Sequence, residues 1–226
     1  MGDFFQNGTI ATLHDFRSRT TEELEAELKI FSAYRPMEIV LPCLFSELEG
    51  DALPAIVEEI SRTNYLNHVV IGLDRADRKQ FEYAYEFFCG LKQPFSILWN
   101  DGPRLRAIQQ ELEDVGLGPT EAGKGRNVWY SIGFVNARGK ADAVALHDCD
   151  VLTYERRLLA RLLYPMANPN FQFEFCKGYY PRVAEGKMNG RANRLLVGPL
   201  LLALERVLGP SDYLSFMRGF RYLLAG

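Results

Sequence analysis

An apolar run that ends in two carboxylates guides our interpretation of the whole chain: Ala143-Val144-Ala145-Leu146-His147-Asp148-Cys149-Asp150. It predicts a buried strand with Asp148 and Asp150 at its carboxyl end. Because alternate side chains of a strand share a face, we expect both carboxylates to point the same way, at the edge where open α/β sheets bind ligands. Such hard oxygen donors suit Mg²⁺ or Mn²⁺ bound together with a diphosphate. A metal-free Asp-rich turn would have the same sequence, so the pair needs support from elsewhere.

Strands and helices alternate on the N-terminal side of this run. Residues 37–42, 69–73 and 95–99 are predicted strands, and we expect Pro42 to end the first of them. Helical spacing predicts helices over 20–33, 53–60, 79–91, 103–115 and 126–136. The alternation predicts an α/β fold with a mainly parallel sheet and helices on both faces.

Residues that could contribute to a ligand site follow each of these three strands. They are Cys43, Leu44 and Glu47 after Pro42, then Asp74 and Arg75, then Asn100, Asp101 and Gly102. An open α/β sheet gathers a nucleotide pocket from such loops, where a carboxylate such as Asp74 or Asp101 accepts from base or ribose donors. Taken singly, each is also typical of an ordinary loop or helix cap.

A second motif, Gly123-Lys124-Gly125, precedes the last predicted helix. Small residues let backbone N–H groups approach a phosphate, the helix N-terminus adds partial positive charge, and Lys124 adds a full one. The spacing is not that of a P-loop, and no dinucleotide-binding glycine motif follows the first strand. A flexible glycine loop is the alternative, but the nearby Asp148 and Asp150 favour an anion site.

Composition narrows the class of protein further. The chain has 226 residues and a net charge of −3, which fits one large globular domain and argues against general nucleic-acid binding. Its four cysteines are scattered, so neither a disulfide framework nor a structural zinc is indicated. No signal peptide or membrane span is recognisable. We therefore expect a cytoplasmic protein whose partner is a small molecule.

The motifs together resemble a known family. Leu41-Pro42-Cys43-Leu44, Gly123-Lys124-Gly125, His147-Asp148-Cys149-Asp150, Lys177-Gly178-Tyr179-Tyr180 and Asn189-Gly190-Arg191 look like the GT-A glycosyltransferases of the glucosyl-3-phosphoglycerate synthase type and their mannosyl- and glucosylglycerate relatives. The resemblance implies a Rossmann-like GT-A fold. It also implies a retaining transferase that uses Mg²⁺ or Mn²⁺ to move glucose from UDP-glucose to 3-phosphoglycerate, on the route to a compatible solute.

The resemblance also assigns roles to residues. It places the loop Pro42–Glu47, with Asp74, around the uridine, and Lys124 on the diphosphate. Asp150 becomes the direct metal ligand, and Asp148 lies near the ribose or a metal-bound water. Gly190, Arg191, Ala192 and Asn193 would hold the acceptor phosphate, although the family has different residues at Asn189, Ala192 and Asn193. Lys124, Asp150 and Arg191 are the predicted catalytic residues.

The expected domain organisation is an N-terminal arm and helix over 1–36 and a nucleotide-sugar-binding domain over 37–226. Residues 220–226 resemble a family segment that precedes a histidine metal ligand and further acceptor contacts, so we expect that C-terminal part to be missing. Two alternatives stay open: a sugar-phosphate nucleotidyltransferase, and a non-catalytic domain that binds a nucleotide sugar or another chain. A homodimer also stays open.

Overall fold

The computed structural model describes residues 10–11, 19–119, 121–171, 173–176, 178, 183–184, 187–188 and 198–209. The chain divides into two compact units, one of residues 16–171 and one of residues 1–15 with 172–226. In the second unit, β1 (Ile10–Ala11) pairs in parallel with β6 (Phe175–Cys176), β7 (Val183–Ala184) pairs with β8 (Lys187–Met188), and α7 spans Gly198–Leu208. The domain division at residue 37 stays a prediction.

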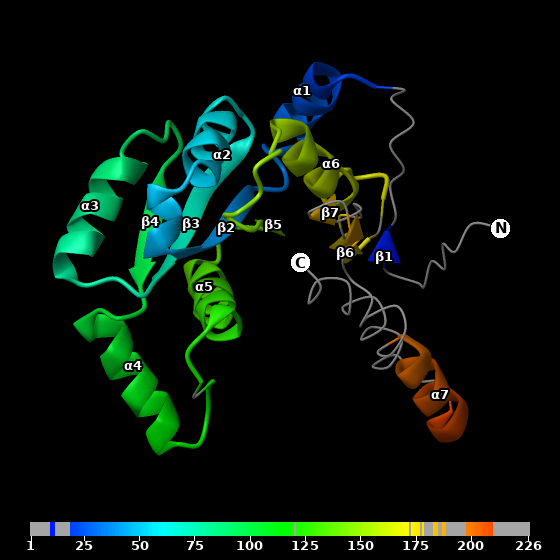
Figure 1. Ribbon diagram of the computed structural model, residues 1–226. Helices are drawn as coiled ribbons and strands as arrows, with labels where there is room; N and C mark the ends of the chain where they lie inside the picture. Colours follow the sequence, from blue (N-terminus) through cyan, green and yellow to red (C-terminus); the bar gives the residue numbers. More distant parts are fainter. Residues whose placement is uncertain are drawn as a thin grey trace. The chain divides into compact units, whose positions relative to one another are not determined.

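The unit of residues 16–171 contains every strand and helix that the alternation predicts (Figure 1). In chain order they are α1 (Thr21–Phe31), β2 (Met37–Leu44), η1 (Phe45–Glu49), α2 (Ala52–Ser61), β3 (Leu66–Asp74), α3 (Arg78–Phe88), β4 (Phe95–Trp99), α4 (Pro103–Asp114), α5 (Lys124–Arg138), β5 (Ala143–Leu146) and α6 (Arg156–Ala167). Local signals set several helix starts. Thr20 caps α1 by accepting the N–H of Glu23, and the Glu23 carboxylate accepts the N–H of Thr20 in return.

The four strands of this unit form one parallel sheet in the order β4-β3-β2-β5. Successive strands step from β2 to β3 to β4, and the chain then returns to place β5 on the other side of β2. The predicted α/β class and parallel sheet are therefore confirmed. Because the strand order reverses at β2, the crevice between the carboxyl ends of β2 and β5 is the topological switch point, where such sheets bind ligands.

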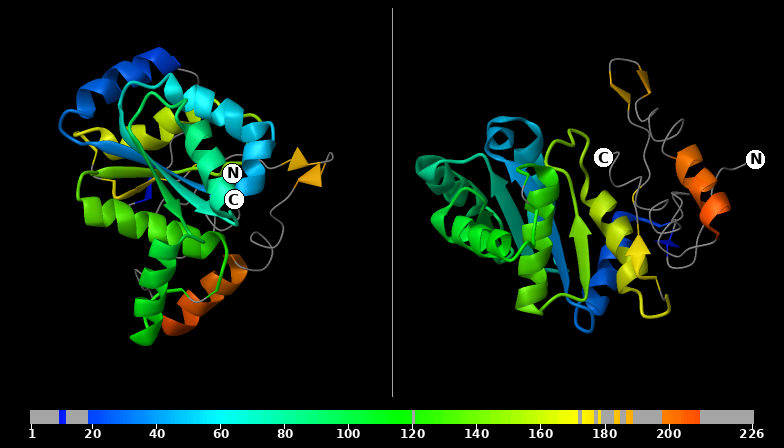
Figure 2. Two further views of the ribbon diagram at one scale, coloured as in Figure 1. Left: turned by 90° about the vertical axis from the view of Figure 1, so that its left-hand side faces the viewer. Right: turned by 90° about the horizontal axis from the view of Figure 1, so that it is seen from below.

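Helices cover both faces of the sheet. On one face, Ile39, Leu41 and Cys43 of β2 join a core with apolar side chains of α1, α2, α3 and α6. On the other face, Val40 of β2 packs with Val70 and with Val135 of α5. Helices α1 and α6 lie side by side in Figure 1 and Figure 2, joined by a tilted ring contact between Phe31 and Tyr164. Over the described part of the chain, no helix is long and apolar enough to cross a membrane.

Strand β2 does not end at Pro42, which corrects one prediction: it continues to Leu44 and pairs with β3 to its end. Val40 accepts the N–H of His147 on the β5 side, so Pro42, two residues later, faces that same side. The ladder to β5 ends at the pair Val40–Leu146, so Pro42 interrupts no hydrogen bond by lacking an N–H group.

Strand β5 also differs from its prediction. It was expected to be buried and to carry the aspartates, but Val144 is 38% exposed, and the strand ends at Leu146. Among the described strands only β2 pairs with it, so β5 is an edge strand with one face partly in solvent. Asp148 and Asp150 therefore lie in the loop and turn after β5, and strand alternation does not set their directions.

Helix α5 approaches the sheet closely at Gly72 of β3. The Asn127 side chain of α5 donates to the Gly72 carbonyl at 2.6 Å, and a Cβ on Gly72 would lie 1.8 Å from Asn127 Oδ1 and 2.6 Å from Ser131 Oγ. Gly72→Ala should therefore force α5 outward and lower the free energy of unfolding by about 1–3 kcal/mol, as measured by urea denaturation. Gly125→Ala is the matched control, because a Cβ there has no described atom within 4 Å. Equal stabilities of the two variants would contradict this packing.

A buried histidine on β3 should make the stability of the fold depend on pH. His68 on β3 contacts Ser96 Oγ through Nε2 at 2.9 Å, and burial, helped by Arg138 and Lys140, lowers its pKa from 6.5 to about 4. Between these values the unfolded chain binds a proton that the folded chain does not. Stability should therefore fall as the pH drops from 6.5 towards 4, by up to about 3 kcal/mol for this group. Urea denaturation of His68→Gln across this range should give a shallower dependence, and an unchanged one would contradict the assignment.

Candidate active site

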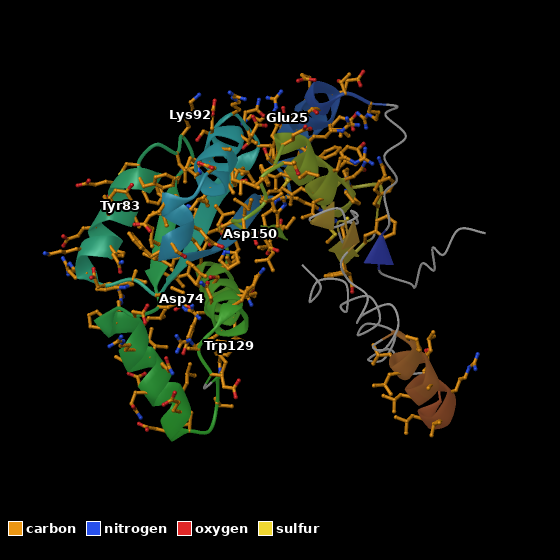
Figure 3. The ribbon with its side chains drawn as sticks, viewed as in Figure 1. Glu25, Asp74, Tyr83, Lys92, Trp129 and Asp150 are labelled. Atoms are coloured by element: carbon orange, nitrogen blue, oxygen red, sulfur yellow. The ribbon has the colours of Figure 1, made fainter. Side chains whose placement is uncertain are left out.

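A cavity of about 210 Å³ opens at the carboxyl ends of β2, β3 and β5, beside the N-terminus of α5. It occupies the switch point between β2 and β5. The cavity is lined by nine of the residues that were predicted for donor or metal binding, which are Pro42, Cys43, Leu44, Glu47, Asp74, Gly123, Lys124, Asp148 and Asp150. Arg75, Asn127 and Cys149 complete its lining. Figure 3 shows the two ends of the sheet: Lys92, which precedes β4, lies at the top of the view, and Asp74, at the end of β3, lies lower.

An ion pair joins the two charged motifs of the sequence. Lys124 Nζ, at the first residue of α5, contacts Asp148 Oδ1 in the loop after β5. The Asp148 side chain is 18% exposed, whereas that of Lys124 is 54% exposed, so the lysine can reorient towards solvent. A bound cation could take the place of Lys124 beside the Asp148 carboxylate, and a bound anion could take the place of Asp148 beside the Lys124 ammonium. The arrangement thus suits a ligand that brings both charges, such as a metal-bound diphosphate.

The start of α5 has features that suit an anion. Gly123 has φ 150°, a backbone conformation that favours glycine, and its carbonyl accepts the N–H of Asn127 at 3.1 Å. No side chain caps this helix start in the described structure. The first-turn N–H groups are therefore left for water or a ligand, and the helix dipole favours a negative one.

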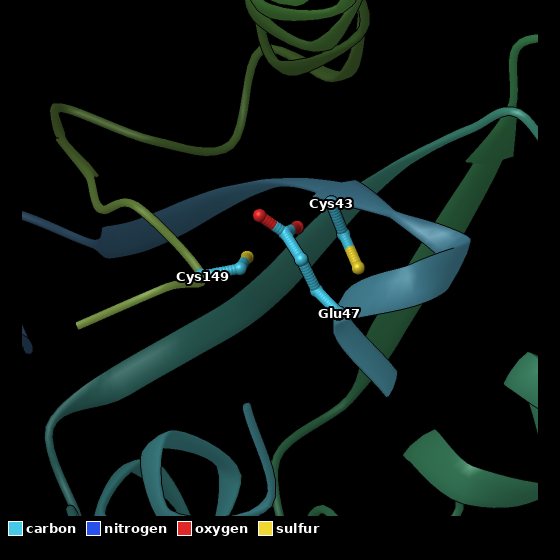
Figure 4. Close-up of side chains that lie close together, drawn as sticks. All are labelled: Cys43, Glu47 and Cys149. Carbon is cyan, nitrogen blue, oxygen red and sulfur yellow. The ribbon is translucent and has the colours of Figure 1, made fainter. Parts of the chain in front are cut away.

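Glu47 and two cysteines form the buried wall of the cavity (Figure 4). Glu47 of η1 accepts the backbone N–H of Leu44 at 2.7 Å. Burial nevertheless raises the pKa of the Glu47 carboxyl, and the nearby Asp150 charge adds to that shift. The pKa of the Cys149 thiol is raised by its hydrogen bond with Cys43 and by burial. From the sequence, Cys43 was predicted to belong to the donor-binding loop, whereas Cys149 was assigned no role.

Asp74 is held by an arginine that sequence reasoning missed. Arg126 NH2 lies 3.7 Å from Asp74 Oδ1, and both side chains are almost fully buried. Asp74 also accepts the N–H of Arg75, whose φ of 56° is in the left-handed region. Arg126 sits in the first turn of a helix, and no spacing links it to Asp74, so the sequence carries no signal for this pair.

Two other candidates lie outside the cavity. Asp101 accepts the N–H of Ala76 at 3.1 Å and holds the loop after β3, so it is a structural carboxylate here. His147 is partly buried, with its ring 5.3 Å from that of Tyr154, and burial of the ring lowers its pKa to about 4. Packing of His147 is thus more consistent with the structure than metal binding.

A larger hollow flanks β4 but lacks the chemistry of a charged ligand site. It has a volume of about 730 Å³ and is lined mainly by aromatic and small polar residues, with Lys92 as the charged member. None of the described residues that line it is a carboxylate, so they offer no hard oxygen ligand of that kind to a divalent cation. The predicted acceptor residues Gly190, Arg191, Ala192 and Asn193 lie outside the described residues.

Comparisons with known proteins agree with the motif resemblance. The chain is 46% identical over its whole length to a glucosyl-3-phosphoglycerate synthase from Persephonella marina and 36% identical over 99% of its length to one from Methanococcoides burtonii. It covers 56% and 55% of these relatives, so it spans about half the length of the curated relatives that it matches. No family model matches the chain. The predicted resemblance to glucosyl-3-phosphoglycerate synthases is therefore confirmed by the sequence identity to these two relatives.

Solved structures support the fold independently. The chain matches the glucosyl-3-phosphoglycerate synthase of Mycobacterium tuberculosis in complex with Mn²⁺, UDP and glucosyl-3-phosphoglycerate with a TM-score of 0.51 and 20% identity, over 88% of this chain and 59% of that one. The same enzyme in complex with phosphoglyceric acid gives a TM-score of 0.52 and 22% identity, over 88% and 58% of the two chains. At these identities the likeness concerns the fold, which is the predicted GT-A type.

Proposed function

We propose that this chain, which is similar over its whole length to glucosyl-3-phosphoglycerate synthases, binds UDP-glucose in the cavity at the β2–β5 switch point. In the active enzyme it would transfer glucose to 3-phosphoglycerate with retention of configuration. One observation carries this proposal: Lys124, Asp148, Asp150 and the uncapped start of α5 converge on one cavity. Such a combination suits a metal-bound diphosphate better than an uncharged ligand.

The uridine would occupy the part of the cavity bounded by the loop from Pro42 to Glu47 and by Asp74. Asp74 is nearly buried and held by Arg126, so its oxygens keep a fixed direction for base or ribose donors. The diphosphate would then reach Gly123 and Lys124, where backbone N–H groups and the ammonium neutralise its charge.

The carboxylates fit a divalent cation. Asp148 and Asp150 border the same cavity and present the hard oxygen donors that Mg²⁺ and Mn²⁺ prefer, with room for a diphosphate and water as further ligands. A related enzyme was solved with Mn²⁺ and UDP-glucose together, which supports Mn²⁺ here, and the donor set equally admits Mg²⁺. We propose Asp150 as the direct metal ligand. Asp148 would lie near the ribose or contact a water bound to the metal. When bound, the cation would withdraw charge from the diphosphate.

The residues of this chain would act by electrostatics. Breaking the bond between glucose and the diphosphate adds negative charge to the leaving group, and Lys124 and the α5 N-terminus meet that charge as it develops. We propose that the acceptor hydroxyl attacks from the face that the diphosphate leaves, which retains the configuration. The buried wall of Cys43 and Cys149 would keep water from that side of the cavity.

The acceptor assignment gives a separate prediction. We propose that Gly190, Arg191, Ala192 and Asn193 hold the phosphate of 3-phosphoglycerate, since a guanidinium binds phosphate through two hydrogen bonds. Arg191→Lys should then raise KM for 3-phosphoglycerate several-fold and leave KM for UDP-glucose near its starting value. Steady-state kinetics with glycerate as a second acceptor is the control, because glycerate lacks the phosphate. An effect confined to UDP-glucose would contradict the assignment.

The proposed activity is tested by incubating the protein with Mn²⁺, UDP-glucose and 3-phosphoglycerate and measuring released UDP and the mass of the sugar product. We expect UDP and glucosyl-3-phosphoglycerate in equal amounts, and neither when 3-phosphoglycerate is omitted or Asp150→Asn is used. UDP binding without product would instead favour the non-catalytic nucleotide-sugar-binding alternative. Formation of UDP-glucose from UTP and glucose 1-phosphate would favour a nucleotidyltransferase.

A further inference from the structure

The buried wall of the cavity brings together two thiols and a carboxylate. Cys43 Sγ, Cys149 Sγ and a Glu47 oxygen all lie within 4.8 Å of one another. In Figure 4 the three side chains point towards one another from β2, from η1 and from the loop after β5. The donor-binding proposal uses Glu47 and the backbone near Cys43, but it assigns no chemistry to the pair of thiols.

The sheet register explains why the thiols meet. Val40 of β2 pairs with Leu146 of β5, and the N–H of His147 still reaches the Val40 carbonyl at 3.1 Å. Continuing that register by three residues places Cys43 beside Cys149. Both are almost completely buried, at 0% and 1% exposure. Burial therefore holds the two sulfur atoms in place, that of Cys43 from the end of β2 and that of Cys149 from the turn after β5.

Glu47 is oriented before any cation binds. Its Oε2 accepts the Leu44 N–H at 2.7 Å, which holds the carboxylate over the end of β2. Cys43 donates to the Leu44 carbonyl at 3.2 Å, a weak bond that it would give up on becoming a thiolate. Little rearrangement is then needed for the three groups to face a common point.

We propose that Cys43, Glu47 and Cys149 form a binding site for a thiophilic divalent cation of the Zn²⁺ or Cd²⁺ class, next to but chemically distinct from the Asp148 and Asp150 site. Thiolates select such cations, whereas Mg²⁺ and Mn²⁺ prefer oxygen donors. Binding releases one proton from each thiol to solvent, and a water would complete the four-coordinate set that Zn²⁺ favours.

Occupation of this site should oppose nucleotide binding, a consequence that rests on the proposed function. Cys43, Glu47 and Cys149 all line the same cavity as Lys124 and Asp150. A cation on them would hold Glu47 and the loop after β5 in one arrangement, so that neither could adjust to a bound nucleotide. We expect Zn²⁺ to weaken UDP binding measured in excess Mn²⁺ by roughly tenfold or more.

Cadmium tests the site without nucleotide. Reduced full-length protein is titrated with Cd²⁺ while the near-ultraviolet cadmium–thiolate charge-transfer band is recorded. We expect the band to saturate at one Cd²⁺ per chain, to be lost in Cys43→Ser and Cys149→Ser, and to persist in Asp150→Asn. Cys89→Ser is the matched control, because Cys89 is an exposed thiol at the end of α3. Circular dichroism checks that each variant is folded, and Glu47→Gln, which keeps both thiols, should weaken Cd²⁺ binding.

The results separate this inference from the proposed function. A band that survives Cys149→Ser, or that is lost in Asp150→Asn, would overturn the thiol site. If the band behaves as expected but the protein binds no UDP, the thiol site stands and the nucleotide proposal fails. If UDP binds and Zn²⁺ weakens it equally in the wild type and in Cys149→Ser, the proposed antagonism is wrong.

Discussion

Lys124→Ala is expected to weaken UDP binding by about 1.5–3 kcal/mol, which is roughly 10- to 100-fold, and to leave uridine binding nearly unchanged. The reason is that a hydrogen bond from an ammonium to a diphosphate is charge-assisted, and uridine has no phosphate to receive it. In the free protein Lys124 pairs with Asp148, so the substitution also removes this ion pair from the carboxylate. Binding of Mn²⁺ alone should therefore be as tight as before or tighter.

Isothermal titration of UDP, uridine and Mn²⁺ separates these effects. Lys92→Ala is the control for a lost surface charge, because Lys92 is exposed and lies outside the cavity near the amino end of β4. Lys124→Arg should retain much of the UDP affinity, since it keeps the charge. Equal losses for UDP and uridine would show that Lys124 supports the fold of the cavity and does not bind the diphosphate.

Arg138→Leu is expected to lower the free energy of unfolding by about 3–5 kcal/mol at neutral pH. Arg138, at the end of α5, places NH1 3.0 Å from both carboxylate oxygens of Glu38, which lies fully buried at the start of β2. Burial raises the pKa of Glu38 even with Arg138 opposing it. Without the arginine, a buried charge would have no compensating partner.

Urea denaturation of a mutant cycle checks this explanation. The double variant Arg138→Leu with Glu38→Gln should recover much of the lost stability, because it removes the charge as well as its partner. The Arg138→Leu defect should also shrink as the pH falls through the raised pKa of Glu38, where the carboxyl becomes neutral. Arg78→Ala, which breaks an exposed pair with Glu82, should cost less than about 1 kcal/mol. A similar cost for the two arginine variants would contradict the account.

Local patterns were enough to predict the sheet and its helices, because apolar runs and capping residues act within a few positions of the chain. The Thr20 cap and the alternation from β2 to β5 are examples, and their outcome is confirmed. Pro42 was misjudged because its effect depends on which side of β2 its missing N–H would face. That direction is a property of the neighbouring strand, and the sequence around Pro42 does not contain it.

The candidate site, too, has parts that the sequence predicts and parts that it does not. The residues at strand ends were predictable, since parallel strands bring their carboxyl ends to one edge. The contacts between them were not: Arg126 on Asp74, Lys124 on Asp148, and Cys43 beside Cys149 each join positions more than 20 residues apart. Such pairs follow from strand register and helix placement, which sequence periodicity does not report. The roles assigned to the site residues therefore stay predictions.

The central claim is that UDP binds through a divalent cation held by the aspartates after β5. Calorimetric titration of UDP into the protein with Mn²⁺, with EDTA, and into Asp150→Asn with Mn²⁺ tests it most directly. We predict clear binding in the first case and a loss of roughly 10- to 100-fold or more in the other two, since each removes a metal–phosphate contact. The same UDP affinity in all three titrations would contradict the account.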